Sequence, residues 1–168
     1  MEERTKYSVV IVTYNRCELL KKCIDHVLSQ SLSFDEIMIV DNHSEDGTKA
    51  YLKDICKRHE TGGEQKKRQK IHVIRTAKNL GGAGGFHLGV KQVMKSDTDW
   101  VLLIDDDAML EADYLEKLHA FIQKNKDVNA CSGTVMTEGV IDVSHRRKMG
   151  NRLLFLEQPA AKEQYRKD

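Results

Sequence analysis

A regular alternation of apolar, strand-like runs with amphipathic helical segments constrains the fold of this chain more than any other feature. The first run, residues 7–15, is almost entirely apolar and rich in β-branched residues, which suits a strand buried on both faces of a parallel sheet. Three further runs follow, at residues 36–42, 70–76 and 100–107. This alternation predicts an α/β fold with a doubly wound, mostly parallel sheet and right-handed crossovers.

Each run is followed by apolar residues at the three- and four-residue spacing of an amphipathic helix. We expect Asn15 to cap the first helix, with Glu18 as its partner, and Ser44 to cap the second. A glycine-rich turn is expected before the third helix, and later strands at residues 128–136 and 139–144. The residues expected on the buried helix faces are Leu20, Cys23, Ile24, Val27, Leu28, Tyr51, Leu52, Ile55, Phe86, Val90, Val93, Met94, Leu115, Leu118, Phe121 and Ile122.

Length and charge limit the classes of function. A chain of 168 residues is long enough for a hydrophobic core, and its net charge of +1 gives no global field that would favour nucleic acid. No apolar run approaches the roughly 18 residues of a membrane helix, and the polar start is unlike a signal peptide. We expect a cytoplasmic protein with reduced cysteines, no nucleic-acid partner and no transmembrane segment. The basic residues 145–152 suggest at most peripheral contact with the inner face of the membrane.

Polar clusters stand at the end of every predicted strand. They occupy residues 13–16, 41–48, 79–85 and 105–107. The carboxyl ends of parallel strands lie on one edge of a doubly wound sheet, and ligands bind beyond that edge. We therefore expect these four loops to converge on one binding site.

Three adjacent aspartates, Asp105, Asp106 and Asp107, end the fourth apolar run. Like charges this close repel, and carboxylates are unfavourable beside a core, so a compensating group is expected. Side chains alternate along an extended chain, so Asp105 and Asp107 should point one way and Asp106 the other. Two carboxylates on one side suit a hard divalent cation such as Mg²⁺ or Mn²⁺, which takes oxygen ligands. The alternative is a solvated acidic loop.

The other residues at the strand ends are less specific. Asp41 is placed to accept hydrogen bonds from a base or ribose, although an Asp before an Asn is also a common turn former. Tyr14 is placed to stack on a base or to be a half-buried ring. The glycine run departs from the G-x-G-x-x-G dinucleotide motif because His87 occupies the third glycine position, and no P-loop motif is present. The glycines still permit close approach of backbone to a ligand, just before a helix N-terminus.

Four motifs together resemble a known family. The stretches "VVIVTYNR", "IVDNHSEDGT", "NLGGAGGF" and "WVLLIDDDA" occur in the order and spacing of the inverting GT-A glycosyltransferases of family 2. The pairing of "NLGGAGGF" with "DDDA" is most similar to the galactofuranosyl- and rhamnosyltransferase-like branch. The resemblance covers roughly residues 7–136 and implies a GT-A, Rossmann-like half that binds a nucleotide sugar.

The resemblance also implies roles for individual residues. Thr13, Tyr14 and Asp41 would contact the nucleobase and its ribose. Asp105 would lie near the ribose or the metal, and Asp107 would bind Mg²⁺ or Mn²⁺ that bridges the diphosphate. The full set implied for the nucleotide sugar is Thr13, Tyr14, Asn15, Asp41, Asn79, Gly81, Gly82, Asp105 and Asp106, and the implied metal ligands are Asp105 and Asp107.

The implied reaction is metal-dependent transfer, with inversion, of a sugar from a UDP- or dTDP-sugar to a hydroxyl of a saccharide or lipid-linked saccharide. Family members place the catalytic base downstream of the aspartates, where this chain offers only Asp142 and His145. We expect residues 1–136 to bind the donor. Residues 137–168 are expected to be the start of an acceptor-side region, or an exposed tail, of a truncated chain.

Two other functions remain open on the same residues. A non-catalytic nucleotide-sugar-binding module would differ only in lacking the acceptor half, so turnover separates it from an enzyme. A nucleotidyltransferase has a related sheet, but it is expected to carry a basic, glycine-rich loop after the first strand, where this chain has "TYNRCE".

Overall fold

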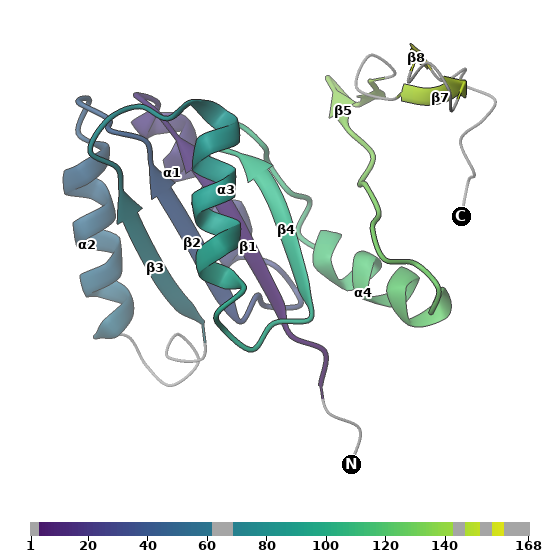
Figure 1. Cartoon of the computed structure of the whole chain (residues 1–168). Helices are drawn as coiled ribbons and strands as arrows, with labels where there is room; N and C mark the ends of the chain where they lie inside the picture. The colour runs from purple at the N-terminus through teal and green to yellow at the C-terminus, as the bar shows by residue number, and fades with distance from the viewer. Residues whose placement is uncertain (1–3, 62–68, 143–146, 152–155, 160–168) are drawn as a thin grey trace. The chain divides into compact units, whose positions relative to one another are not determined.

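The chain divides into two compact units, Met1–Gln123 and Lys124–Asp168. The computed structural model describes residues 4–61, 69–142, 147–151 and 156–159. The first unit alternates strands and helices along the chain (Figure 1). The elements in order are β1 (Tyr7–Thr13), α1 (Cys17–Leu28), β2 (Glu36–Asp41), α2 (Thr48–Glu60), β3 (Lys70–Arg75), α3 (Gly81–Val93), β4 (Trp100–Asp105) and α4 (Tyr114–Lys124).

Strands β1 to β4 form one parallel sheet in the order β3-β2-β1-β4. Because β1 pairs with β2 on one side and with β4 on the other, the strand order reverses between β1 and β4. In this register Thr13 lies opposite Asp41, and Val12 lies opposite Asp105. The predicted α/β fold with a doubly wound, mostly parallel sheet is confirmed.

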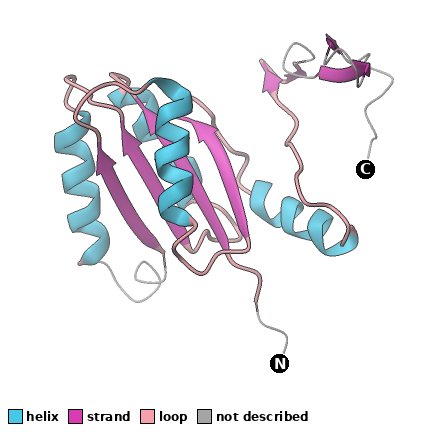
Figure 2. Ribbon diagram, viewed as in Figure 1, coloured by secondary structure: helices cyan, strands magenta, loops and turns pink. Residues whose placement is uncertain are grey.

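Helices cover both faces of the sheet, because the apolar side chains of β1 and β2 alternate between the two faces. On one face, the buried residues Ile11 and Ile39 join α1, α2 and α4 in one core. On the other face, Val10 and Met38 pack against Val93 of α3. Figures 1 and 2 show α3 in front of the sheet and α1 behind it. The carboxyl ends of the strands are therefore flanked by helices on both sides.

Most residues predicted for the buried helix faces are buried. The buried ones are Leu20, Cys23, Ile24, Val27, Leu52, Ile55, Val93, Leu115 and Ile122. Two predictions are wrong: Met94 is 68% exposed and Phe121 is 38% exposed. Met94 is the C-cap residue of α3, so it lies past the last helical turn that the sheet covers.

Helix α3 begins earlier than the sequence predicts. The glycines expected to form a turn are its first residues, because α3 starts at Gly81. Gly85 and Gly89, one helical turn apart, lie against β1. A Cβ on Gly85 would lie 2.5 Å from Cγ1 of Val12, and a Cβ on Gly89 would overlap Cγ1 of Val10. Glycine at these two positions therefore lets α3 lie close to the sheet.

Neither predicted helix cap forms. Arg16 and Gly47 hold the N-cap positions of α1 and α2, and neither makes a side-chain cap. The carboxylate of Asp46, in the loop before α2, instead accepts hydrogen bonds from the N–H of Cys17 at 2.8 Å and from Oγ1 of Thr48 at 2.6 Å. An N–H at the start of α1 is thus satisfied from a neighbouring loop, which spacing within the helix does not reveal.

The second unit contains short antiparallel pairs. Strand β5 (Met136–Thr137) pairs with β6 (Val140–Ile141). Glu138 and Gly139 form the turn between them, with φ angles of 53° and 76°. Strand β7 (Arg147–Asn151) pairs with β8 (Leu156–Pro159).

The later strands of the sequence analysis are only partly correct. Of residues 128–136, only Met136 is in a strand. Of residues 139–144, the strand holds Val140–Ile141, and residues 143–144 lie outside the described part of the chain. The predicted boundary at residue 136, between donor-binding and acceptor-side regions, stays a prediction. Across the described residues, no helix combines the length and the apolar character needed to span a membrane.

Candidate active site at the carboxyl edge of the sheet

The loops that follow β1, β2, β3 and β4 meet at the edge where the strands end, called the rim below (Figure 1). Hydrogen bonds tie these loops together in pairs. Oδ1 of Asn15 accepts from the N–H of Glu45 at 2.7 Å, and Nδ2 of Asn42 donates to Oδ1 of Asn79 at 2.8 Å. The convergence of loops expected from the sequence is therefore present.

The three aspartates alternate in exposure, although β4 ends at Asp105 and the next two aspartates lie in a turn. Asp106 is buried, with 3% of its surface exposed, whereas Asp105 and Asp107 are exposed. Oδ2 of Asp106 accepts a hydrogen bond from Oγ1 of the buried Thr13 at 2.7 Å. The middle aspartate therefore anchors the end of β4 to the end of β1, at the reversal of strand order. The outer two aspartates remain exposed.

Arg16 supplies part of the positive charge that compensates the aspartates, whereas the sequence alone suggested a metal cation for this role. Its Nη1 donates to Oδ2 of Asp107 at 2.9 Å and contacts Oδ1 of Asp106 at 3.3 Å. Sequence reasoning missed this residue. The signal was an arginine directly after the first strand, but its relevance depends on β1 lying beside β4, which spacing alone does not give.

Arg16 compensates the negative charge of the three aspartates only in part. Burial, followed by the charges of Asp107 and Asp106, raises the pKa of Asp105, and Arg16 opposes this only in part. Burial also raises the pKa of the Cys23 thiol to about 12, with smaller contributions from the three aspartates. This cysteine lies under the rim as a neutral thiol, and it is not a nucleophile at neutral pH.

Asp41 holds the loop between β2 and α2. It is 1% exposed, and its Oδ1 accepts from the N–H of Ser44 at 2.8 Å. Its Oδ2 accepts from Nη1 of Arg75, whose Nη2 also donates to the carbonyl of Ser44 at 2.7 Å. Both carboxylate oxygens therefore have partners inside the protein. A contact with a ribose or base, as the resemblance implies for Asp41, stays a prediction.

Asn42 organises the loop before α3, and sequence reasoning did not single it out. Its Oδ1 accepts from the N–H of Leu80 at 2.8 Å, and its Nδ2 donates to Oδ1 of Asn79 and, at 3.1 Å, to the carbonyl of Gly81. Oδ1 of Asn79 also accepts from the N–H of Gly81 at 2.8 Å. The available signal was a polar residue directly after Asp41, at the end of the second apolar run.

Three predicted binding residues present an open surface. Tyr14 is 44% exposed, and a Cβ on Gly81 or Gly82 would meet no atom within 4 Å. Gly81 has a φ of 71°, which favours glycine because a side chain would be strained there. These residues thus leave room for a ligand, unlike Gly85 and Gly89.

The donor set at the rim fits a divalent cation only in combination with a substrate. Asp105 and Asp107 offer two exposed carboxylates, and burial followed by the neighbouring carboxylates raises the pKa of Asp105. Within the described residues, no three His, Cys, Asp or Glu side chains are grouped to hold a metal. Mg²⁺ typically binds one or two carboxylates and takes further oxygens from phosphates and water, so the residues present fit such an ion.

The candidate bases belong to the second unit. Oδ2 of Asp142 accepts a hydrogen bond from Oγ1 of Thr137 at 3.0 Å, and the N–H of Asp142 donates to the carbonyl of Val135. His145 lies outside the described residues. The role of either residue as a base stays a prediction.

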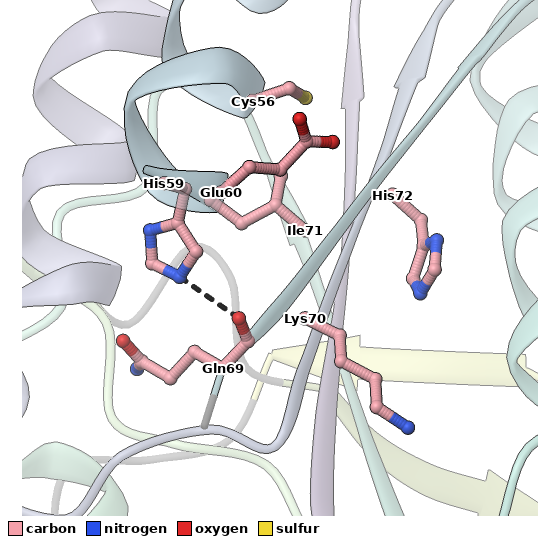
Figure 3. Close-up of a pocket in the computed structure, with 7 residues that line it drawn as sticks. All are labelled: Cys56, His59, Glu60, Gln69, Lys70, Ile71 and His72. Carbon is pink, nitrogen blue, oxygen red and sulfur yellow. Dashed lines mark hydrogen bonds between the residues drawn. The ribbon is translucent and has the colours of Figure 1, made fainter. Parts of the chain in front are cut away.

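A pocket of about 260 Å³ lies at the opposite edge of the sheet, between the end of α2 and the start of β3 (Figure 3). Nε2 of His59 is 2.9 Å from the carbonyl oxygen of Gln69, so this nitrogen carries the proton and donates. The side-chain nitrogen of Gln69 is buried and has no hydrogen-bond partner in the described part of the chain. This pocket is built from other elements than the rim and contains none of the predicted site residues.

Comparison with known families identifies the class of protein. The model of the family described as Glycosyl transferase family 2 matches residues 8–167, so the chain belongs to that family. The resemblance stated from the four motifs is confirmed.

Curated relatives carry glycosyltransferase names. Galactofuranosyltransferase GlfT1 of Mycolicibacterium smegmatis is 34% identical over 100 residues, which cover 58% of this chain and 28% of the relative. The poly(ribitol-phosphate) beta-glucosyltransferase of Bacillus spizizenii is 27% identical over 123 residues, which cover 72% of this chain and 18% of the relative. The chain therefore spans less than a third of the length of either relative.

Solved structures share the fold. S. aureus TarS 1–349 in complex with UDP superposes with a TM-score of 0.58 at 23% identity, over 73% of this chain and 33% of that chain. The mannosyltransferase PcManGT of Pyrobaculum calidifontis, in complex with GDP-Man and Mn²⁺, gives a TM-score of 0.59 at 20% identity, over 72% of this chain and 33% of that chain. These likenesses confirm the predicted GT-A fold.

Proposed function

We propose that this chain is the donor-binding part of a metal-dependent glycosyltransferase. The enzyme would transfer a sugar, with inversion, from a UDP- or dTDP-sugar to a hydroxyl of a saccharide or lipid-linked saccharide. We expect it to act in the cytoplasm, with at most peripheral contact with the membrane.

One observation carries the proposal. The aspartates at the end of β4 lie beside the end of β1, where the strand order reverses, and Thr13 fixes the middle one at 2.7 Å. A reversal of this kind is where α/β sheets bind nucleotides. The TarS structure with UDP and the PcManGT structure with GDP-Man and Mn²⁺ support a nucleotide sugar and a cation as the ligands.

The residues of the rim have separate roles in binding the cation and the donor. Asp107, with Asp105, would hold Mg²⁺ or Mn²⁺, which neutralises charge that builds up on the leaving diphosphate. Buried Asp106 orients the other two aspartates through its bond to Thr13. Tyr14 stacks on the base, and the open glycines before and within the first turn of α3 let the donor approach the backbone.

The acceptor hydroxyl must lose its proton as it attacks the anomeric carbon. A carboxylate base would take that proton, and Asp142 is the candidate among the described residues. Since the chain spans 28% of galactofuranosyltransferase GlfT1, a base supplied by a longer form of the protein fits equally well.

The test is calorimetric titration of UDP and of dTDP into the purified chain, each with and without Mn²⁺. We expect binding that requires Mn²⁺ and that weakens roughly tenfold or more in Asp107→Asn. The matched control is Asp54→Asn, because Asp54 is an exposed aspartate on α2 that also pairs with an arginine, at 2.8 Å.

Binding of neither nucleotide by the folded chain would refute the donor-site proposal. Equal loss of binding in Asp54→Asn would show that the effect of Asp107→Asn is not local to the rim. Sugar transfer by the isolated chain, lost in Asp142→Asn but not in Thr137→Val, would add the assignment of Asp142 as the base.

A further inference from the structure

Arg16 already pairs with a carboxylate that the proposed cation would need. Nη1 of Arg16 donates to Oδ2 of Asp107 at 2.9 Å and lies 3.3 Å from Oδ1 of Asp106. One guanidinium nitrogen thus contacts two carboxylates, and its single positive charge offsets them only in part. A cation bound by Asp107 would meet a like charge at this position, so the two cations compete.

The two aspartates are held very differently. Asp106 is buried and has a second, short hydrogen bond from Thr13, so it keeps a partner when Arg16 moves. Asp107 has half of its side chain exposed, and Arg16 is the only partner recorded for it among the described residues. Exchange at Asp107 is therefore the easier of the two.

Arg16 has a fixed backbone and an exposed side chain, so its guanidinium can change partners. Its backbone is fixed as the N-cap residue of α1, with its carbonyl accepting from the N–H of Leu20 at 2.9 Å. Its side chain is 51% exposed, so the guanidinium can leave Asp107 without opening the core. A diphosphate at the rim would offer it a bidentate anionic partner, which a guanidinium binds better than a single carboxylate oxygen.

We propose that Arg16 makes cation binding at Asp107 conditional on the nucleotide diphosphate. This inference rests on the proposed function, because it assumes that the rim binds both ligands. Without diphosphate, Arg16 stays paired with Asp107 and disfavours binding of the cation there. With diphosphate, Arg16 turns to the phosphates and releases Asp107, so each ligand strengthens the binding of the other by the same factor.

The experiment measures Mn²⁺ affinity from the electron paramagnetic resonance signal of free Mn²⁺, with and without UDP. We expect wild type to bind Mn²⁺ more tightly when UDP is present. Arg16→Met, which keeps the length of the side chain without its charge, should bind Mn²⁺ alone roughly three- to tenfold more tightly than wild type. UDP should then enhance the Mn²⁺ affinity of this variant by a smaller factor.

Two further variants keep the result interpretable. Arg16→Lys retains the charge but lacks the fork, so its Mn²⁺ affinity should lie between those of wild type and Arg16→Met. The matched control is Arg58→Met, since Arg58 forms an exposed pair with Asp54 on α2 at 2.8 Å. This control should leave both Mn²⁺ affinities unchanged.

The sign of the change separates this role from a purely structural one. If Arg16 only braced the aspartates, Arg16→Met would weaken Mn²⁺ binding or leave it unchanged, and either result overturns the inference. In that case UDP-dependent Mn²⁺ binding by wild type, lost in Asp107→Asn, would leave the proposed function standing. Absence of Mn²⁺ binding in wild type and Arg16→Met, with and without UDP, overturns both.

Discussion

The glycines of α3 perform two different tasks, and a matched pair of substitutions separates them. Gly89 lies on the side of α3 that packs against the sheet, where an added Cβ would overlap Cγ1 of Val10 and lie 3.2 Å from Cγ2 of Val40. Both valines are fully buried, so neither has room to move. Gly82 lies in the first turn of the same helix, and an added Cβ there would meet nothing within 4 Å.

The magnitudes favour opposite outcomes at the two positions. Replacing glycine by alanine inside a helix gains up to about 1 kcal/mol from helix propensity. Forcing a methyl group into a packed interface costs about 1–3 kcal/mol. The overlap at Gly89 is with a fully buried valine, so the cost should lie at about 2–3 kcal/mol, and Gly89→Ala should lower the free energy of unfolding by about 1–2 kcal/mol. Gly82→Ala should leave it unchanged or raise it by up to about 1 kcal/mol.

Urea titration gives the free energy of unfolding of each variant, and calorimetry gives the affinity of the folded protein for UDP with Mn²⁺. Gly82→Ala should fold normally but bind UDP more weakly, because the new methyl group occupies the open face of the proposed donor site. A Gly89→Ala variant as stable as wild type would refute the close contact between α3 and β1. Unchanged UDP binding by Gly82→Ala would remove this glycine from the donor site.

Three other predictions follow from single contacts. Thr13→Val removes the hydroxyl that donates to Asp106 and should lower the free energy of unfolding by about 1.5–3 kcal/mol in urea titration. Thr13→Ser keeps the hydroxyl and should therefore retain most of the wild-type stability. A raised pKa means that Asp105 holds its proton more tightly when folded, so its ionisation opposes folding as pH rises above the unfolded value. Asp105→Asn should therefore be more stable than wild type at pH 7 without cation, with the difference shrinking as the pH falls toward about 4; a constant difference would contradict this. Gln69→Met removes a buried nitrogen that has no partner within the described residues, so it should raise the free energy of unfolding by about 1 kcal/mol and raise the unfolding temperature. A lower unfolding temperature in Gln69→Met would mean that the amide has a hydrogen-bond partner.

The sequence predicted the elements and the convergence of the four polar loops well, because both depend on local pattern. Runs of apolar residues identified β1, β2, β3 and β4, and their polar ends identified the rim. The predicted alternation matches the burial of Asp106, but Asp106 and Asp107 lie in a turn after β4, and one nitrogen of Arg16 contacts both, so these two carboxylates do not point in opposite directions. The family followed from the motifs at these strand ends.

The helix starts were predicted poorly, because their partners are not local. The carboxylate of Asp46 that serves α1 comes from the loop before α2, 29 residues from Cys17. The glycine run was interpreted as a turn, since glycine is unfavourable in helices. Its place in α3 makes sense only once β1 lies directly beneath Gly85 and Gly89.

By itself, the sequence determined which segments are strands and helices, and that four polar loops end on one edge, because hydrophobic periodicity acts over a few residues. Only the tertiary structure determined which side chains meet there. Arg16 reaches Asp106 across 90 residues of chain, and Arg75 reaches Asp41 across 34, because β1 lies between β2 and β4 and β2 lies beside β3. Strand order sets these pairs, and it depends on how whole helices cover the sheet rather than on the spacing of any one motif.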